Sequence, residues 1–177
     1  MSFNATQQLE ILLIDKSYSN DSEQAGWKFR LVDNHILHVQ PSGFLDLEAY
    51  LKMSEALTFI RKEYFLSSDF LILIFDFTLF QKADSEVRAQ IISNDIFKDK
   101  RTRFILFGMN YFVFTVAKII NKSLRKEPLY VVKNEAEALE KAKQVVSDLT
   151  LQKVNEIQNS NYYSQKKNTV SIKGKKY

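Results

Sequence analysis

The residues best placed to do chemistry stand at the end of an uninterrupted apolar run. Residues 70–75 read Phe-Leu-Ile-Leu-Ile-Phe and lead into Asp76, and Asp84 and Ser85 open the next helical pattern. A run this short and this apolar indicates a strand that is buried on both faces of a helix-covered sheet. Sites in such sheets form at the carboxyl edge of the strands. We therefore expect the functional site in the stretch 76–88.

The sequence lacks the constellations that catalysis and metal binding usually require. There is no cysteine, and the two histidines, His35 and His38, stand three apart on a predicted strand, where they face opposite sides and cannot form a two-histidine metal face. No nucleophile stands at a recognisable spacing from both a base and an orienting partner. Four glycines without a Gly-x-Gly-x-x-Gly or Gly-x4-Gly-Lys motif leave no phosphate-cradling loop. We expect no enzymatic activity, no metal and no cofactor.

Composition and charge divide the chain into a neutral body and a basic tail. The 177 residues are 45% hydrophobic and include 14 phenylalanines, enough for the core of one compact domain with extensions. Residues 161–177 carry five lysines and no acidic residue, which leaves 20 basic and 21 acidic groups in residues 1–160. Because no aromatic-basic motif accompanies these lysines, we do not expect a nucleic-acid partner.

The sequence contains neither a predicted membrane span nor a predicted signal peptide. No run approaches the roughly 18 apolar residues of a membrane span, and no basic stretch precedes the apolar segment 9–14 as it would in a signal peptide. Together with the absence of cysteine, this predicts a cytoplasmic protein.

The first third of the chain is predicted to be mostly extended. Residues 9–14 form a short strand or a tether to a partner, and residues 16–26 have the composition of a linker. Residues 27–32 alternate at period two, and an Asp-Asn turn joins them in a hairpin to a strand over 35–39. The Pro-Ser-Gly sequence at 41–43 ends that strand.

From Asp46 onward, helical and extended patterns alternate. Asp46 is the predicted N-cap of an amphipathic helix. The apolar positions of this helix are Leu47, Tyr50, Leu51, Leu57, Ile60 and Tyr64. A helix over 85–97, marked by Val87 and Ile91, follows the apolar strand.

The second half of the chain repeats the same alternation. A basic turn over 98–103 leads to a buried strand over 104–107, a helix over 111–124 and a last strand over 129–132. Asn134 caps a final helix that starts at Glu135. This order predicts an α/β fold with a mainly parallel or mixed sheet of about five strands and helices packed on it.

Three domain regions follow from these patterns. We expect an N-terminal extension and linker over 1–26, an α/β domain over 27–147, and a helical extension with a basic flexible tail over 148–177. Apolar residues at three- and four-residue spacing continue weakly into that extension, so a homodimer through the C-terminal helix is one expectation.

Three stretches resemble one family in their order and spacing. Residues 35–46 end in Gly-x-Leu-Asp before a helix. In residues 75–85, Asp76 and Asp84 stand eight apart, and Ser follows the second Asp. Residues 129–139 read as a strand followed by Glu-Ala-Glu-Ala-Leu. Across Trp27 to Val146 this pattern resembles the STAS domain, the fold of the bacterial anti-sigma-factor antagonists.

This resemblance implies a regulatory module that acts through protein contacts and is phosphorylated by a cognate kinase at the position of Ser85. The implied partner is a kinase, a phosphatase or an anti-sigma-like protein. The residues expected to contact it are Asp76, Thr78, Asp84, Glu86 and Arg88. In this sequence the family's Asp-Ser-[Ser/Thr]-Gly motif is replaced by Asp-Ser-Glu-Val. A lipid-transfer-like branch of the same superfold lacks the phosphorylation site altogether, and this chain could belong to that branch.

Two alternatives remain open for the residues themselves. Asp84 or Ser85 can serve only as a helix cap, with Glu86 favoured beside the positive helix start. The stretch 104–114 contains five aromatic residues, which suit either ordinary core packing or a pocket for a small apolar ligand or lipid.

Overall fold

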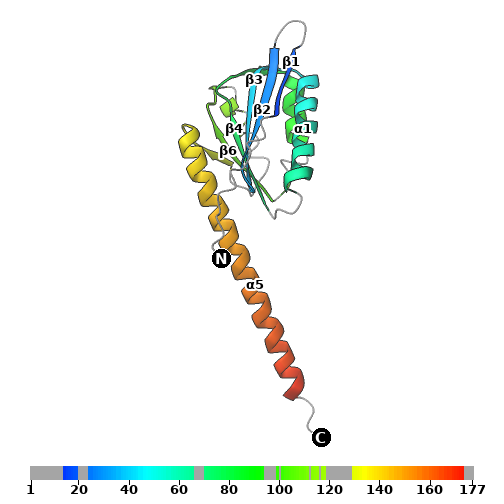
Figure 1. The fold of residues 1–177 in the computed structure, drawn as a ribbon, viewed down its shortest axis with the longest axis vertical. Helices are drawn as coiled ribbons and strands as arrows, with labels where there is room; N and C mark the ends of the chain where they lie inside the picture. The colour runs from blue at the N-terminus through cyan, green and yellow to red at the C-terminus, as the bar shows by residue number, and fades with distance from the viewer. Residues whose placement is uncertain are drawn as a thin grey trace, which may run out of the picture. The chain divides into compact units, whose positions relative to one another are not determined.

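The computed structural model describes most of the chain as an α/β fold (Figure 1). The described residues are 14–19, 24–65, 70–93, 99, 101–111, 113–115, 117–118 and 129–173. The strands are β1 (Ile14–Ser19), β2 (Gln24–Asp33), β3 (Ile36–Leu45), β4 (Leu71–Asp76), β5 (Phe80–Ala83), β6 (Thr102–Phe107) and β7 (Leu129–Val131). The helices with defined bounds are α1 (Leu47–Phe65), α2 (Ser85–Ser93) and α5 (Glu135–Lys173).

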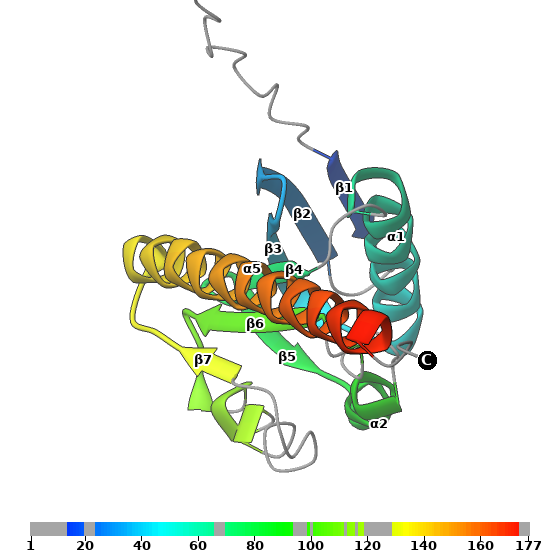
Figure 2. The ribbon, with the colours of Figure 1, turned by 90° about the horizontal axis from the view of Figure 1, so that it is seen from below.

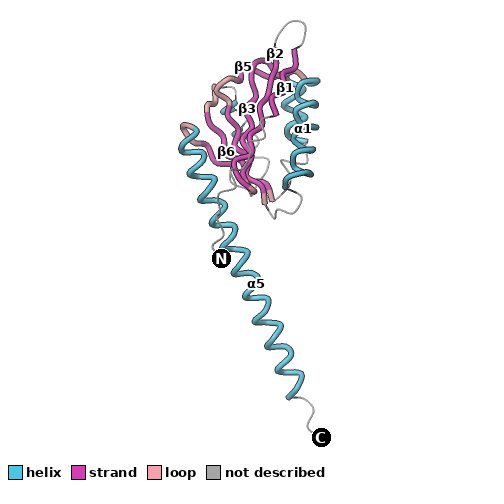
Figure 3. The backbone as a smooth tube through the Cα atoms, in the orientation of Figure 1, coloured by secondary structure: helices cyan, strands magenta, loops and turns pink. Residues whose placement is uncertain are grey.

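The seven strands form one mixed sheet, which confirms the predicted fold class (Figure 3). The strand order is β1-β2-β3-β4-β6-β7, and β5 pairs with the end of β3. β1, β2 and β3 are antiparallel, whereas β3, β4, β6 and β7 run parallel. β4 lies between β3 and β6, and all six of its residues are buried. The apolar run is therefore the central strand, as predicted.

The two faces of the sheet have separate coverings. One face packs against α1 and α2 in the main hydrophobic core, to which β4 contributes Leu71, Leu73 and Phe75. The other face carries the fully buried Ile72 and Ile74. The first turns of α5 lie on the opposite side of the sheet from α1 (Figure 1 and Figure 2). Because β-strand side chains alternate, a strand covered on both faces must be apolar throughout.

The described chain divides into two compact units, Met1–Ala142 and Lys143–Tyr177, so that the division falls within α5. None of the helices in the described ranges combines the length and the apolar character that crossing a bilayer requires.

The predicted N-terminal linker is wrong, because β1 occupies part of it. Ile14 to Ser19 pair with Phe29 to Gln24 of β2, and β2 itself begins three residues before the predicted strand. An edge strand is held by backbone hydrogen bonds and needs no apolar run, so its composition resembles that of a linker. Of the strand or tether predicted over 9–14, residues 9–13 lie outside the described residues, and Ile14 is the first residue of β1.

β3 continues through the Pro-Ser-Gly sequence that was predicted to end it. β4 pairs with β3 up to Val39, and β5 pairs with β3 from Gly43. Pro41 lies between these two parallel partners, so its missing N–H interrupts neither ladder. Gly43 has a φ of 70° and stands at a register shift, a conformation that glycine adopts without strain.

The cap of α1 was predicted correctly, but part of its apolar face was not. The Asp46 carboxylate accepts a hydrogen bond from the Ala49 N–H at 2.8 Å, as an N-cap does. The side chains of Leu51 and Tyr64 are exposed, at 46% and 44%. In their place Ala49, Met53 and Phe65 are buried.

The later elements differ from prediction mainly at their ends. β6 begins at Thr102, inside the predicted basic turn. The described residues 111, 113–115 and 117–118 are helical, and the rest of the helix predicted to 124 lies outside the described residues, as does the predicted end of α2 over 94–97.

The helical part of the predicted C-terminal extension reaches further than expected. α5 continues to Lys173 without a break. Asn134 caps its start, accepting from the Glu137 N–H at 2.9 Å. Since no glycine or proline follows until Gly174, nothing in this stretch interrupts a helix.

Candidate functional site

The carboxylate of Asp76 organises the turn that follows β4. One of its oxygens accepts hydrogen bonds from the Thr78 N–H at 2.9 Å and the Thr78 hydroxyl at 2.7 Å. The other accepts from the side-chain amide of Gln40 at 2.5 Å. The residue is only 6% exposed. The prediction that Asp76 contacts a partner is therefore corrected: it holds Thr78 in place from below the surface.

After this turn the chain presents a large apolar side chain to solvent. Leu79 is 55% exposed, while its neighbour Phe80 is buried and meets Phe77 edge-on at 5.5 Å between ring centroids. The Leu79 carbonyl accepts a hydrogen bond from the Gly43 N–H at 2.9 Å. The backbone of the turn is thus anchored to β3, and the Leu79 side chain faces outward.

The predicted phosphorylation site lies at the start of α2. Asp84, Ser85 and Glu86 are exposed, and the Asp84 N–H donates to the carbonyl of Leu45 at 3.1 Å. Val87, one residue further, is fully buried and fixes the helix against the core. Within the described residues the side chains of Asp84 and Ser85 make no hydrogen bond, so the predicted side-chain cap is not seen there.

β4 and β5 both run parallel to β3. The strand that ends at Asp76 and the strand that precedes Ser85 therefore point toward the same edge of the sheet. Thr78, exposed like Asp84 and Glu86, belongs to the same connection between β4 and α2. Arg88 lies on α2, but its side chain is outside the described residues.

A second loop, at the end of β6, is joined to this connection. The Asn110 side chain donates to the carbonyl of Gln81 at 3.0 Å and accepts from the Val113 N–H at 3.0 Å. One amide therefore caps the helical turn after Asn110 and joins this turn to β5. The Phe77 N–H also donates to the carbonyl of Phe107 at 3.0 Å. This link between loops is not detectable in the sequence, since the two partners are 29 residues apart.

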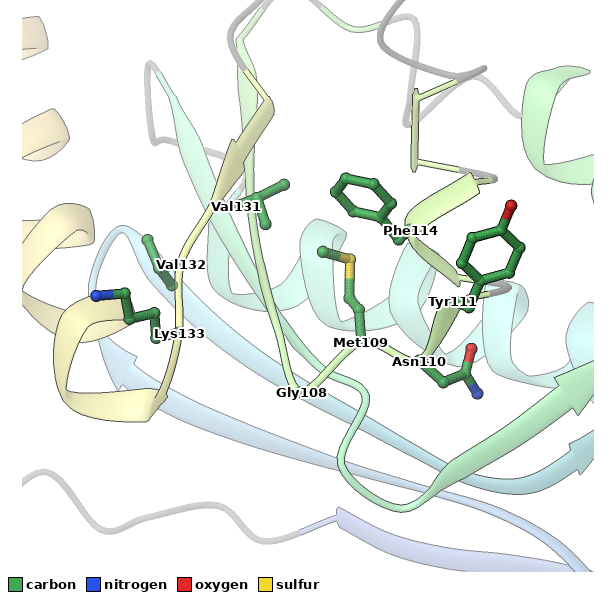
Figure 4. A pocket seen from close by; sticks show the side chains of 8 residues that line it. All are labelled: Gly108, Met109, Asn110, Tyr111, Phe114, Val131, Val132 and Lys133. Atoms are coloured by element: carbon green, nitrogen blue, oxygen red, sulfur yellow. The ribbon is translucent and has the colours of Figure 1, made fainter.

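Beside this junction lies a pocket of about 420 Å³. Its lining residues come from the end of β6, the following helical turn and the end of β7, and they are Gly108, Met109, Asn110, Tyr111, Phe114, Val131, Val132 and Lys133. Figure 4 shows the side chains of Met109, Phe114 and Val131 directed toward one another. The predicted aromatic stretch 104–114 is thus split, because Phe104 and Phe107 are buried in the core and Phe114 lines the pocket.

On the other face of the sheet, His38 lies in a buried polar cluster. It is 7% exposed, pairs across the sheet with Arg30, and its Nε2 has no hydrogen-bond partner in the described part of the chain. Arg30 forms an ion pair with Glu135 at the start of α5. Burial and the neighbouring Arg30 lower the pKa of His38, against the opposite effect of Glu135 and Asp76.

The two histidines have separate surroundings. His35 stacks on Phe70 with ring centroids 4.4 Å apart, whereas His38 lies 6.0 Å from the Phe107 ring. Across the described ranges, no three histidine, cysteine, aspartate or glutamate side chains gather as a metal site would require.

The chain has likenesses among solved structures. No family model and no curated protein matches the chain. The chain is similar to an uncharacterised protein of the DUF3478 family from Shewanella loihica PV-4, described as having a SpoIIAA-like fold. The sequences are 13% identical, the match covers 79% of this chain and 97% of that one, and the TM-score is 0.46.

Proposed function

We propose that this chain is a non-enzymatic regulatory domain that binds a protein partner in the bacterial cytoplasm. Its binding surface is the docking edge, which we define as Thr78, Leu79, Asp84, Ser85 and Glu86. The observation that carries the proposal is the 55% exposure of Leu79 on a turn fixed from beneath by the Asp76 carboxylate.

An exposed apolar residue with polar neighbours has the composition of a small interface. Interface cores are apolar and their rims are polar. Leu79 supplies the apolar part, and Thr78, Asp84, Ser85 and Glu86 supply exposed polar groups in the same connection. Because the backbone of the turn is already held by the hydrogen bonds to Asp76 and from Gly43, binding would order few additional groups.

Ser85 is the proposed switch within the docking edge. Its hydroxyl is exposed at the first residue of α2. A phosphoryl group adds roughly −1.5 to −2 charges and is stabilised by the free N–H groups at a helix start. It would also stand between the carboxylates of Asp84 and Glu86, so modification makes the edge strongly negative and changes the partner that it fits.

The test compares Leu79→Glu with Phe59→Glu. Leu79 and Phe59 are both exposed, and Phe59 lies on α1 with 58% exposure. Each variant therefore places a carboxylate on the surface without opening the core. Tagged wild type and both variants are used to capture proteins from the native cell extract. A protein retained by the wild type and Phe59→Glu, but lost with Leu79→Glu, is then purified and its Kd measured directly.

Two results would overturn the proposal. One is equal affinity of the purified protein for Leu79→Glu and the wild type. The other is the capture of no protein that distinguishes the two variants. Intact-mass measurement of the chain isolated from its native cells tests phosphorylation separately, since binding through Leu79 does not depend on it.

A further inference from the structure

The pocket at the ends of β6 and β7 has features of a small-molecule site. Its volume of about 420 Å³ lies within the range of roughly 300–1,000 Å³ common for ligand pockets. Met109, Phe114 and Val131 converge on its interior (Figure 4). Phe114 is 39% exposed and Val131 48%, so these apolar surfaces are accessible from solvent.

The backbone around the pocket is already organised. Asn110 caps the turn that carries Phe114, and the Phe114 N–H donates to the Asn110 carbonyl at 3.0 Å. On the opposite wall the Val132 N–H donates to the carbonyl of Leu106 at 3.0 Å. A ligand entering between these walls would find them preformed, which reduces the ordering cost of binding.

Two lysines, Lys118 and Lys133, lie at the pocket. The ammonium of Lys118 lies 4.4 Å from the centroid of the Phe114 ring. Lys133 is the one charged residue among the eight that line the pocket, although its ammonium is directed away from the interior (Figure 4). The Glu137 carboxylate accepts a hydrogen bond from the Lys133 backbone N–H at 3.1 Å. A flat apolar group against Phe114 would therefore bring any attached anion close to Lys118.

We propose that this pocket binds a small, flat, apolar molecule that carries one anionic group. The apolar body lies among Met109, Phe114 and Val131, and the anion pairs with Lys118. The pocket adjoins the docking edge through Gly108 and Thr78 but shares no residue with it, and its binding activity does not depend on the proposed protein partner.

Anilinonaphthalene sulfonate, an aromatic anion that fluoresces in apolar surroundings, is the probe. Titrated into the folded full-length chain, it should bind at one saturable site. Phe114→Ala should raise the Kd of that binding about tenfold or more, and a tenfold change corresponds to about 1.4 kcal/mol of binding free energy. Phe59→Ala, which removes another exposed phenylalanine on α1, should leave the affinity unchanged.

The charge requirement is tested with Lys118→Gln. This variant should weaken binding of the sulfonate dye several-fold, and added salt should do the same in the wild type. Binding of the uncharged dye Nile red should stay as it is in the wild type. Should Phe114→Ala fail to fold cooperatively, Val131→Thr is tested instead, because it keeps the β-branched shape and replaces one apolar methyl group with a polar hydroxyl.

The proposal is overturned if the wild type shows no saturable binding, or if the Phe114 and Phe59 variants bind the sulfonate dye equally well. Equal weakening of both dyes by Lys118→Gln would overturn the assignment of an anionic ligand.

Discussion

Gly108 approaches Thr78 so closely that a Cβ atom on the glycine would lie 2.6 Å from the Thr78 methyl carbon and 2.7 Å from its backbone nitrogen. Gly108 also has a φ of 67°, which side-chain-bearing residues rarely adopt. The contact places the end of β6 directly against the turn that Asp76 holds.

Gly108→Ala should therefore destabilise the protein by about 1–3 kcal/mol from backbone strain, with the clash in addition. Urea unfolding measures this loss. Adding Thr78→Ser removes the methyl group but keeps the backbone nitrogen and the left-handed conformation, so the double variant should recover only part of the stability. Gly108→Ala with wild-type stability would contradict the close contact.

Asp76→Ala should lower the free energy of unfolding by about 2–4 kcal/mol, because it removes the buried acceptor of three hydrogen bonds, two from Thr78 and one from Gln40. The matched control is Asp84→Ala. That carboxylate is exposed and makes no hydrogen bond within the described residues, so its removal should change stability by less than about 0.5 kcal/mol. Similar losses for the two variants would show that Asp76 does not order the turn.

The lowered pKa of His38 predicts a loss of stability in mild acid. The folded state binds the proton less readily than the unfolded state, in which the histidine has a pKa of about 6.5. Stability should therefore be independent of His38 above that pH and should fall as the pH drops through it toward the folded-state pKa. Protonation would place a second cation beside Arg30, with Glu135 and Asp76 only partly compensating.

Unfolding free energies measured between about pH 7.5 and 5.5 test this prediction. His38→Gln should flatten the dependence, whereas His35→Gln, on the other histidine, should retain it. A wild-type slope that survives in His38→Gln would assign the effect to another group.

Two variants of Ser85 distinguish a phosphorylation switch from a helix cap. If it is a switch, Ser85→Asp should change the affinity for the captured partner, and Ser85→Ala should behave like the unmodified chain. Because no cap hydrogen bond from Ser85 is found in the described chain, we expect Ser85→Ala to change stability by less than about 0.5 kcal/mol. Equal partner affinities for the two variants would exclude the switch, and a stability loss of about 0.5–2 kcal/mol in Ser85→Ala would favour the cap.

The C-terminal part of α5 presents apolar residues at three-residue spacing. Leu151, Val154 and Ile157 are 59%, 44% and 51% exposed within the single chain. We expect the predicted homodimer to use this stripe, since two such helices bury it against each other. Light scattering should give a dimer mass for the wild type and a monomer mass for Val154→Glu. Thr150→Glu, beside the stripe, should remain dimeric, and a monomeric wild type at high concentration would contradict the prediction.

The sequence by itself determined the features that depend on near neighbours in the chain. Six consecutive apolar residues specify that β4 is buried on both faces, because no alternation leaves a face for solvent. The caps at Asp46 and Asn134 were predictable because their side chains bond to N–H groups three residues away. The resemblance to the STAS domain rests on the same local patterns in their order.

The tertiary structure alone decided which of the predicted site residues face solvent. In the sequence, Asp76 and Ser85 are both polar residues at the boundary of an element. In the structure the Asp76 carboxylate is buried and accepts a hydrogen bond from Gln40, which is 36 residues away. The pocket also needs Phe114 and Val131 on adjoining elements. Such contacts depend on the pairing of β6 with β7 and on which side chains meet across it. A one-dimensional pattern of apolar and polar residues fixes the burial of each element but leaves its neighbours unspecified.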